Sequence, residues 1–192
     1  GKTITSAGHN FSNHVTFQGI GGGWTFLDDI SSTYDIRILN GSLNTNGKNV
    51  SCRQFSTSGN NLTLTITNSI ITCNWPTYNG WQFGGDNISF NMENSLIILQ
   101  NCYFSSSATS YNNVIFNGTS WANLYTSGST FNKIIANLSL DFYGNSNIID
   151  SLISSNGIQV KGGNNTIGYI AVHGLGRLEQ GGKKWSGKNG DC

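Results

Sequence analysis

Asn61-Leu-Thr-Leu-Thr-Ile-Thr-Asn68-Ser-Ile-Ile-Thr72 is followed 26 positions later by Asn87-Ile-Ser-Phe-Asn-Met-Glu-Asn94-Ser-Leu-Ile-Ile98. The two stretches align without a gap, each apolar residue of the first falls on an apolar residue of the second, and Asn-Ser falls on Asn-Ser. An internal repeat of this kind, written in strands and turns, predicts a chain that stacks on itself as a solenoid. A fainter match relates residues 36–43 to residues 64–71 at an offset of 28.

Each copy of the repeat alternates between apolar and polar residues. Period two with one apolar face is typical of a half-buried strand. Stacked copies would place Leu64 over Phe90, with Leu62 over Ile88 and Ile66 over Met92 on either side. The Asn of each Asn-Ser step tolerates a left-handed backbone, so we expect a bend there.

A second motif recurs more loosely at residues 13–19, 112–118 and 132–137. It predicts two inward columns, one of Val15, Val114 and Ile134 and one of Phe17, Phe116 and Ala136. Past residue 145, short apolar stretches separated by Asn-Gly or Gly-Gly-Asn-Asn bends continue the same pattern.

These patterns predict an all-β fold, a single right-handed parallel β-helix of about seven coils over residues 1–173. Residues 174–192 are rich in glycine and basic residues, and we expect a C-terminal cap or tail there, with Trp185 as its anchor. The alternative is an antiparallel β-sandwich or jelly roll, which also gives alternating strands but does not require near-identical segments at a fixed period.

Composition narrows the range of partners. Only 10% of the 192 residues are charged, and the net charge is +1, so we expect no nucleic acid partner. No apolar run is long enough for a membrane span. The richness in Asn, Ser, Thr and Gly is typical of an extracellular, cell-surface or virion protein. Since the chain begins with Gly1, we expect a processed chain or a fragment of a larger protein.

Several segments carry a resemblance: residues 1–6, 22–29, 43–47, 81–90 and 129–132. They resemble the degenerate repeats of large secreted bacterial surface proteins and the solenoid modules of phage tail and virion appendages. The resemblance covers roughly residues 1–172 and implies a passive role as a spacer, an adhesin stalk or an appendage subunit. It carries no functional residues, because such repeats define none.

Residues that could carry chemistry are sparse. Glycoside hydrolysis needs two carboxyl groups that face one sugar bond, but the adjacent Asp28 and Asp29 point to opposite faces of a strand. Asp86 would share a face with Asp141 only for one particular coil count. The basic residues Arg37, Arg53 and Lys133 lie far apart in the sequence without an Asp cluster beside them.

Histidines and cysteines show no ligand pattern. His9, His14 and His173 lack the spacing of a metal site, so we expect no cofactor or metal. The four cysteines, Cys52, Cys73, Cys102 and Cys192, form no CxxC motif. Cys73 occupies the repeat position of Leu99, which predicts a small core residue, and the sequence does not select a disulfide pairing.

The aromatic residues Trp75, Tyr78 and Trp81 lie in the loop between the two best repeats. If exposed in a row they would form a platform for a carbohydrate; otherwise they cap the core at a corner. We therefore expect a non-catalytic structural or adhesive module that contacts other copies of itself or flanking domains. A carbohydrate-binding module and a tailspike-like polysaccharide-degrading enzyme are the alternatives.

Overall fold

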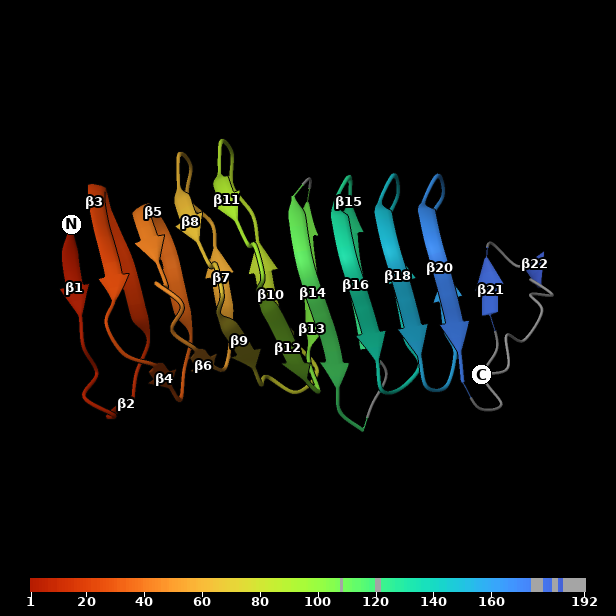
Figure 1. Cartoon of the computed structure of the whole chain (residues 1–192), viewed down its shortest axis with the longest axis horizontal. Helices are drawn as coiled ribbons and strands as arrows, with labels where there is room; N and C mark the ends of the chain where they lie inside the picture. Colours follow the sequence, from red (N-terminus) through yellow and green to blue (C-terminus); the bar gives the residue numbers. More distant parts are fainter. Residues whose placement is uncertain (108, 120–121, 174–177, 181–182, 185–192) are drawn as a thin grey trace.

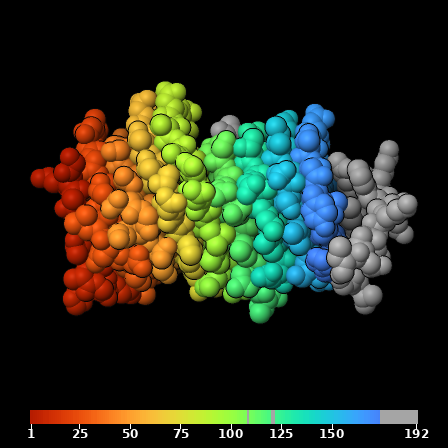
Figure 2. All heavy atoms as spheres, in the orientation of Figure 1, coloured from red at the N-terminus to blue at the C-terminus, as the bar shows by residue number. Residues whose placement is uncertain are grey.

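A computed structural model describes residues 1–107, 109–119, 122–173, 178–180 and 183–184. The described residues contain no helix. They form a parallel β-solenoid of about eight turns, close to the seven expected. Its coils follow one another in sequence order along the long axis of the molecule (Figure 1), and the space-filling view shows the same order as successive bands (Figure 2).

Two sheets line the solenoid. The first has 13 strands: β1 (Lys2–Ile4), β3 (Val15–Phe26), β5 (Ile36–Asn44), β7 (Phe55–Thr57), β8 (Thr63–Thr65), β10 (Asn79–Phe83), β11 (Ser89–Asn91), β13 (Tyr103–Ser107), β15 (Ala122–Ser127), β17 (Leu140–Tyr143), β19 (Ile158–Val160), β21 (Leu178–Gln180) and β22 (Lys183–Lys184). The second has nine: β2 (Asn10–Phe11), β4 (Ile30–Ser32), β6 (Val50–Cys52), β9 (Ile70–Cys73), β12 (Leu96–Gln100), β14 (Ser110–Asn117), β16 (Thr130–Ala136), β18 (Ile148–Ser154) and β20 (Thr166–Val172).

Strand direction decides between the two fold predictions. Every described pairing is parallel except that of β21 with β22. An antiparallel sandwich or jelly roll is therefore excluded for the described strands. Each full coil returns to the same sheet, so strands that pair with each other in one sheet come from successive coils.

The 26-residue repeat lies in register, as predicted. Leu64 pairs with Phe90 and Cys73 pairs with Leu99. The bends fall at the Asn-Ser steps, where Asn68 has a φ of 54° and Asn94 a φ of 53°. Like residues therefore lie over like in this part of the solenoid.

The two fainter matches are corrected by the registers. Leu43 pairs with Leu64, an offset of 21 rather than 28, because the coils in this region are shorter than the repeat suggested. Val114 does pair with Ile134, and Phe116 with Ala136. Val15 and Phe17, the proposed first members of the two columns, lie instead in β3 of the other sheet, because the motif of residues 13–19 forms a different side of the coil.

Coils differ between the two halves of the molecule. In the 13-stranded sheet, β5 pairs through its first half with β7 and through its second half with β8, so one coil contributes two segments to that sheet. β10 and β11 repeat this division. β11 pairs only with β8, and β13 starts a run of coils with one segment each. The coils thus change from three-sided to two-sided after β11. In Figure 1 the loop beside β11 projects above the neighbouring coils.

An aromatic cluster fills the core where the coils narrow. Trp81 is fully buried and stacks on Phe55 at a centroid distance of 5.2 Å. Phe83, Phe90, Phe104 and Tyr111 also lie within 6.4 Å of its ring centroid. The indole Nε1 donates a hydrogen bond to the Tyr111 hydroxyl at 3.3 Å, so the polar end of the buried indole is satisfied.

Beyond β20, β21 extends the 13-stranded sheet past residue 173 by pairing with β19. Residues 174–177, 181–182 and 185–192 lie outside the described residues, and with them Trp185 and Cys192. Among the residues that are described, we find no helix with the length and hydropathy needed to cross a membrane.

Candidate functional site

The three aromatic residues predicted as a carbohydrate platform do not form an exposed row. Trp81 is fully buried within the core, because residue 81 falls on an inward position of β10. Trp75 is half-buried, and Tyr78 is 57% exposed. The rings of Trp75 and Tyr78 stack at 4.7 Å. The surface pair is therefore Trp75 and Tyr78.

A longer stack extends this pair along the solenoid. The Arg53 guanidinium lies 4.4 Å from the ring centroid of Trp75 and 5.0 Å from that of Tyr34. Both distances are typical of a cation–π contact. The stacked groups precede β5, β7 and β10, so they occupy the same corner in successive coils. Arg53 and Tyr78 both lie against the Trp75 ring.

A buried carboxylate organises the base of this stack. The Asp35 side chain is 1% exposed, and its Oδ1 accepts a hydrogen bond from Arg53 Nε at 2.8 Å. Its Oδ2 accepts one from Arg37 Nη2 at 2.6 Å and lies 3.3 Å from His14 Nδ1. We call this cluster the basic corner. It consists of His14, Tyr34, Asp35, Arg37, Arg53, Trp75 and Tyr78.

The electrostatics of the corner keep its charges fixed. Burial alone would raise the pKa of the Asp35 carboxyl, but hydrogen bonds and attraction from Arg53 and Arg37 outweigh it and hold that pKa below its ordinary value. The hydrogen bond to Asp35 raises the pKa of the Arg53 guanidinium. Asp35 is therefore ionised at neutral pH and cannot donate a proton. With two arginines on one carboxylate, the corner carries a net charge of +1 when His14 is neutral.

Sequence reasoning missed this cluster. It treated Arg37 and Arg53 as scattered, but Ile36 pairs with Phe55, an offset of 19 that brings Arg53 beside Asp35. The offset of 28 taken from the fainter repeat hid this proximity. A search for apolar matches at an offset of 19 is the signal that would have found it.

The remaining carboxylates serve other contacts. Asp28 accepts hydrogen bonds from the backbone amides of Ser6 and Ala7, and Asp29 from that of Asn49. These bonds lower the pKa of Asp28, against a smaller opposing effect of burial. The adjacent pair therefore joins neighbouring coils. Asp86 follows β10, whereas Asp141 lies within β17 opposite Asn123, so the two do not share a register position.

A second aromatic ladder lies on the outside of the two-sided coils. Tyr125 stacks on Tyr143 at 4.8 Å with an interplanar angle of 15°. The Lys161 ammonium lies 4.5 Å from the Tyr143 centroid and 2.6 Å from Asp141 Oδ2. Burial raises the pKa of the Tyr125 hydroxyl, and the nearby Tyr143 raises it further to a smaller extent. Face-to-face stacking covers the inner ring faces, so this ladder shows mainly ring edges to solvent.

The three described cysteines are buried, free thiols. Cys52 pairs with Cys73 between β6 and β9, which confirms Cys73 as a core residue. Burial raises the pKa of Cys73 well above its ordinary value and that of Cys102 to about 12. Burial therefore keeps the Cys73 and Cys102 thiols protonated, and all three thiols are shielded from solvent.

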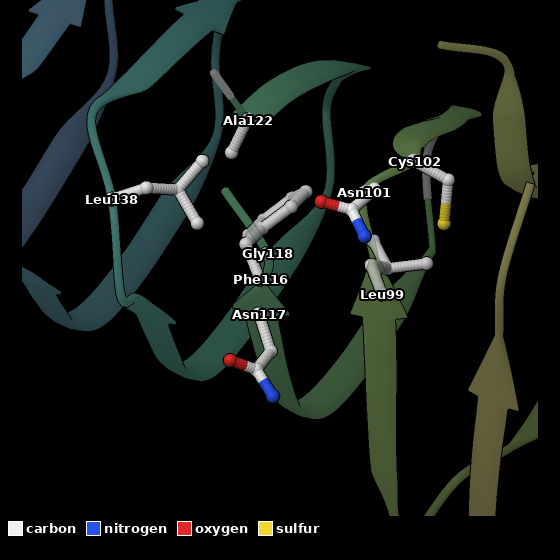
Figure 3. A pocket seen from close by; sticks show the side chains of 8 residues that line it. All are labelled: Leu99, Asn101, Cys102, Phe116, Asn117, Gly118, Ala122 and Leu138. Carbon is white, nitrogen blue, oxygen red and sulfur yellow. The ribbon is translucent and has the colours of Figure 1, made fainter. Parts of the chain in front are cut away.

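A small cavity lies beside Cys102. Its volume is about 10 Å³, room for a single water molecule. In Figure 3, Phe116 stands between Ala122 and Leu138 on one side and Leu99 and Asn101 on the other. Across the described part of the chain, no three His, Cys, Asp or Glu side chains gather as a metal ion would require.

No protein-family model, curated protein or solved structure matches this chain. The basic corner is therefore identified from geometry alone. It is the densest gathering of charged and aromatic side chains among the described residues, and it suits the binding of an anion rather than proton transfer or covalent catalysis.

Proposed function

We propose that this chain is a non-catalytic structural or adhesive module of an extracellular surface protein, a filament or a virion appendage. The observation that carries the proposal is the uninterrupted pairing of successive coils. Each coil forms its β-ladder with the coils before and after it, so the array resists bending as one body and suits a spacer or stalk.

The outer surface supports this role. Hydroxyl and amide side chains bond from coil to coil, as Asn132 does with Asn112 and Asn113, and Thr130 with Ser110. Such a surface stays hydrated without many charges. We expect contacts with other copies or with flanking domains to form at the ends of the solenoid, where the outermost strands offer unpaired backbone groups.

Small-angle X-ray scattering over a range of concentrations tests the structural part. We expect an elongated particle that lengthens or assembles at higher concentration. A compact particle at every concentration would contradict a rod, and a strictly monomeric rod would remove self-association from the proposal.

Carbohydrate contact is the second candidate, favoured by the exposed Tyr34 and Tyr78 beside two arginines. A polysaccharide-degrading enzyme remains the third. Incubation with neutral and acidic polysaccharides, followed by a reducing-end assay, separates the last two. We expect no new reducing ends, and their appearance would overturn the non-catalytic proposal.

A further inference from the structure

We infer that the basic corner binds the carboxylate or sulfate groups of an anionic polysaccharide. This inference rests on the proposed surface role and names its ligand class. Arg37 and Arg53 would bind the anionic groups, and the exposed tyrosines would contact the sugar rings.

The position that Asp35 occupies carries no charge in the neighbouring coil. Asp35 and Gln54 occupy the same position in neighbouring coils, since the next residues, Ile36 and Phe55, are paired. Gln54 is also buried, and its Nε2 donates hydrogen bonds to the Asn79 carbonyl at 2.7 Å and to Gln82 Oε1 at 3.1 Å. A neutral amide therefore satisfies the equivalent buried position of the next coil.

A buried carboxylate with two arginines brings little net stability over a neutral arrangement, because removing the charges from water offsets their attraction. In a chain with only three arginines, two of them on one carboxylate require another explanation. Binding of an anion supplies one.

The arginines keep capacity for a ligand. A guanidinium has five N–H donors, and the contacts with Asp35 use Nη2 of Arg37 and Nε of Arg53. The Arg37 side chain is 41% exposed. Asp35 holds both groups in place, so less side-chain entropy is lost when an anion binds.

The shape of the corner favours a linear polymer. His14, Tyr34, Arg53 and Tyr78 come from four successive coils. Strands in a sheet lie about 4.8 Å apart, so the corner is roughly 14 Å long. The exposed Tyr34 and Tyr78, 40% and 57% exposed, lie beside the cations along this line. Apolar ring surface next to a cation matches a sugar that carries an acidic group.

The test is isothermal titration calorimetry of the whole chain with alginate, dextran sulfate and neutral dextran. We expect binding to alginate, to dextran sulfate or to both, weakened by added salt, and none to dextran. The two anionic probes distinguish carboxylate from sulfate recognition.

Variants locate the site. The triple substitution D35Q/R37Q/R53Q places at residue 35 the Gln of the neighbouring coil, removes both arginines and lowers the net charge by one. The matched control K133Q, on β16, lowers it by one as well. We expect at least tenfold weaker binding in the triple variant and unchanged binding in K133Q.

The single variant R37Q leaves Asp35 paired with Arg53 and serves if the triple variant does not fold. We expect it to weaken binding at least threefold. Equal binding of the triple variant and K133Q, equal binding of dextran, or no binding to either anionic probe would overturn the inference. None of these results would alter the scattering profile that tests the rod itself.

Discussion

The N-terminal and C-terminal halves of the solenoid solve the same stacking problem with different coils. Around β8 and β11 one coil takes 26 residues and has three sides, whereas Leu140 pairs with Ile158 only 18 residues later and the coil has two. The eight extra residues form the additional strand and its corner. Both halves have a core of mixed aromatic and aliphatic side chains, and the basic corner lies on the N-terminal half.

Regular stacking of the strands does not require coils of equal length. The backbone ladder continues from β10 to β13 although the coil loses a side there. The aromatic cluster around Trp81 fills the core at the point where the coil loses its third side. Phe90, on the last three-sided coil, contacts Phe83 at 4.7 Å and Tyr111 at 5.4 Å.

The largest effect is expected from removing the centre of that cluster. Trp81→Ala should lower the free energy of unfolding by about 4 kcal/mol, because the cavity lies where several rings meet. Phe142→Ala, equally buried in the two-sided half, should cost about 3 kcal/mol. Urea unfolding followed by circular dichroism measures both. A larger loss for Phe142→Ala would contradict the role of Trp81 in closing the three-sided half.

Both halves contain glycines with no room for a Cβ, such as Gly59 in the three-sided half and Gly144 in the two-sided half. Gly144 has a φ of 143°, and a Cβ there would lie 1.5 Å from the Thr126 carbonyl oxygen. Gly144→Ala should therefore cost about 3 kcal/mol through strain and overlap. Gly163→Ala is the control, since its Cβ would meet only Asn145 Oδ1 at 3.8 Å. Equal melting temperatures of the two variants would show that the tight corner adapts.

Acid should affect the basic corner selectively. Because the folded-state pKa of Asp35 is depressed, its contribution is present above its ordinary value of 3.8 and is lost as the pH falls through the folded value. Between pH 6 and pH 2 the wild type should lose about 1.5 kcal/mol more than D35Q/R37Q/R53Q, the strength of a charge-assisted hydrogen bond. Urea midpoints at both pH values measure this. Parallel losses would show that Asp35 adds no pH-dependent stability.

The smallest effects are expected on the outside. Tyr78→Ala removes one stacked ring from the basic corner, and Tyr125→Ala removes one from the second ladder. Each should cost about 0.5–1 kcal/mol, the strength of an aromatic pair at the surface. A loss above 2 kcal/mol in thermal unfolding of Tyr78→Ala would mean that this ring supports the core rather than the rim.

The sequence predicted the fold where a near-identical copy fixed the register. The 26-residue offset placed Leu64 on Phe90 correctly, because alternation and an unbroken alignment leave one pairing. It failed where the coil length changes. Val15 was assigned to the wrong sheet, since a short strand motif fits either face of a coil.

The candidate site was predictable only in part. Trp75, Tyr78 and Trp81 were predicted as one group, either an exposed platform or a cap of the core. The buried Trp81 could not be distinguished from the other two, because inward and outward positions in a loop have no period to separate them. Asp35 and Arg53 meet across coils at an offset that no strong repeat marks. The prediction of carbohydrate contact itself stays untested.

The 18-residue spacing of the last coils has a consequence for the history of such chains. Duplicating one such unit would add one strand to each sheet and leave every other contact in place. Length can therefore evolve in whole-turn steps by tandem copying, and each new copy is free to drift on its outer face. A surface feature such as the basic corner can then arise on a few turns while the remaining turns keep a neutral outer face.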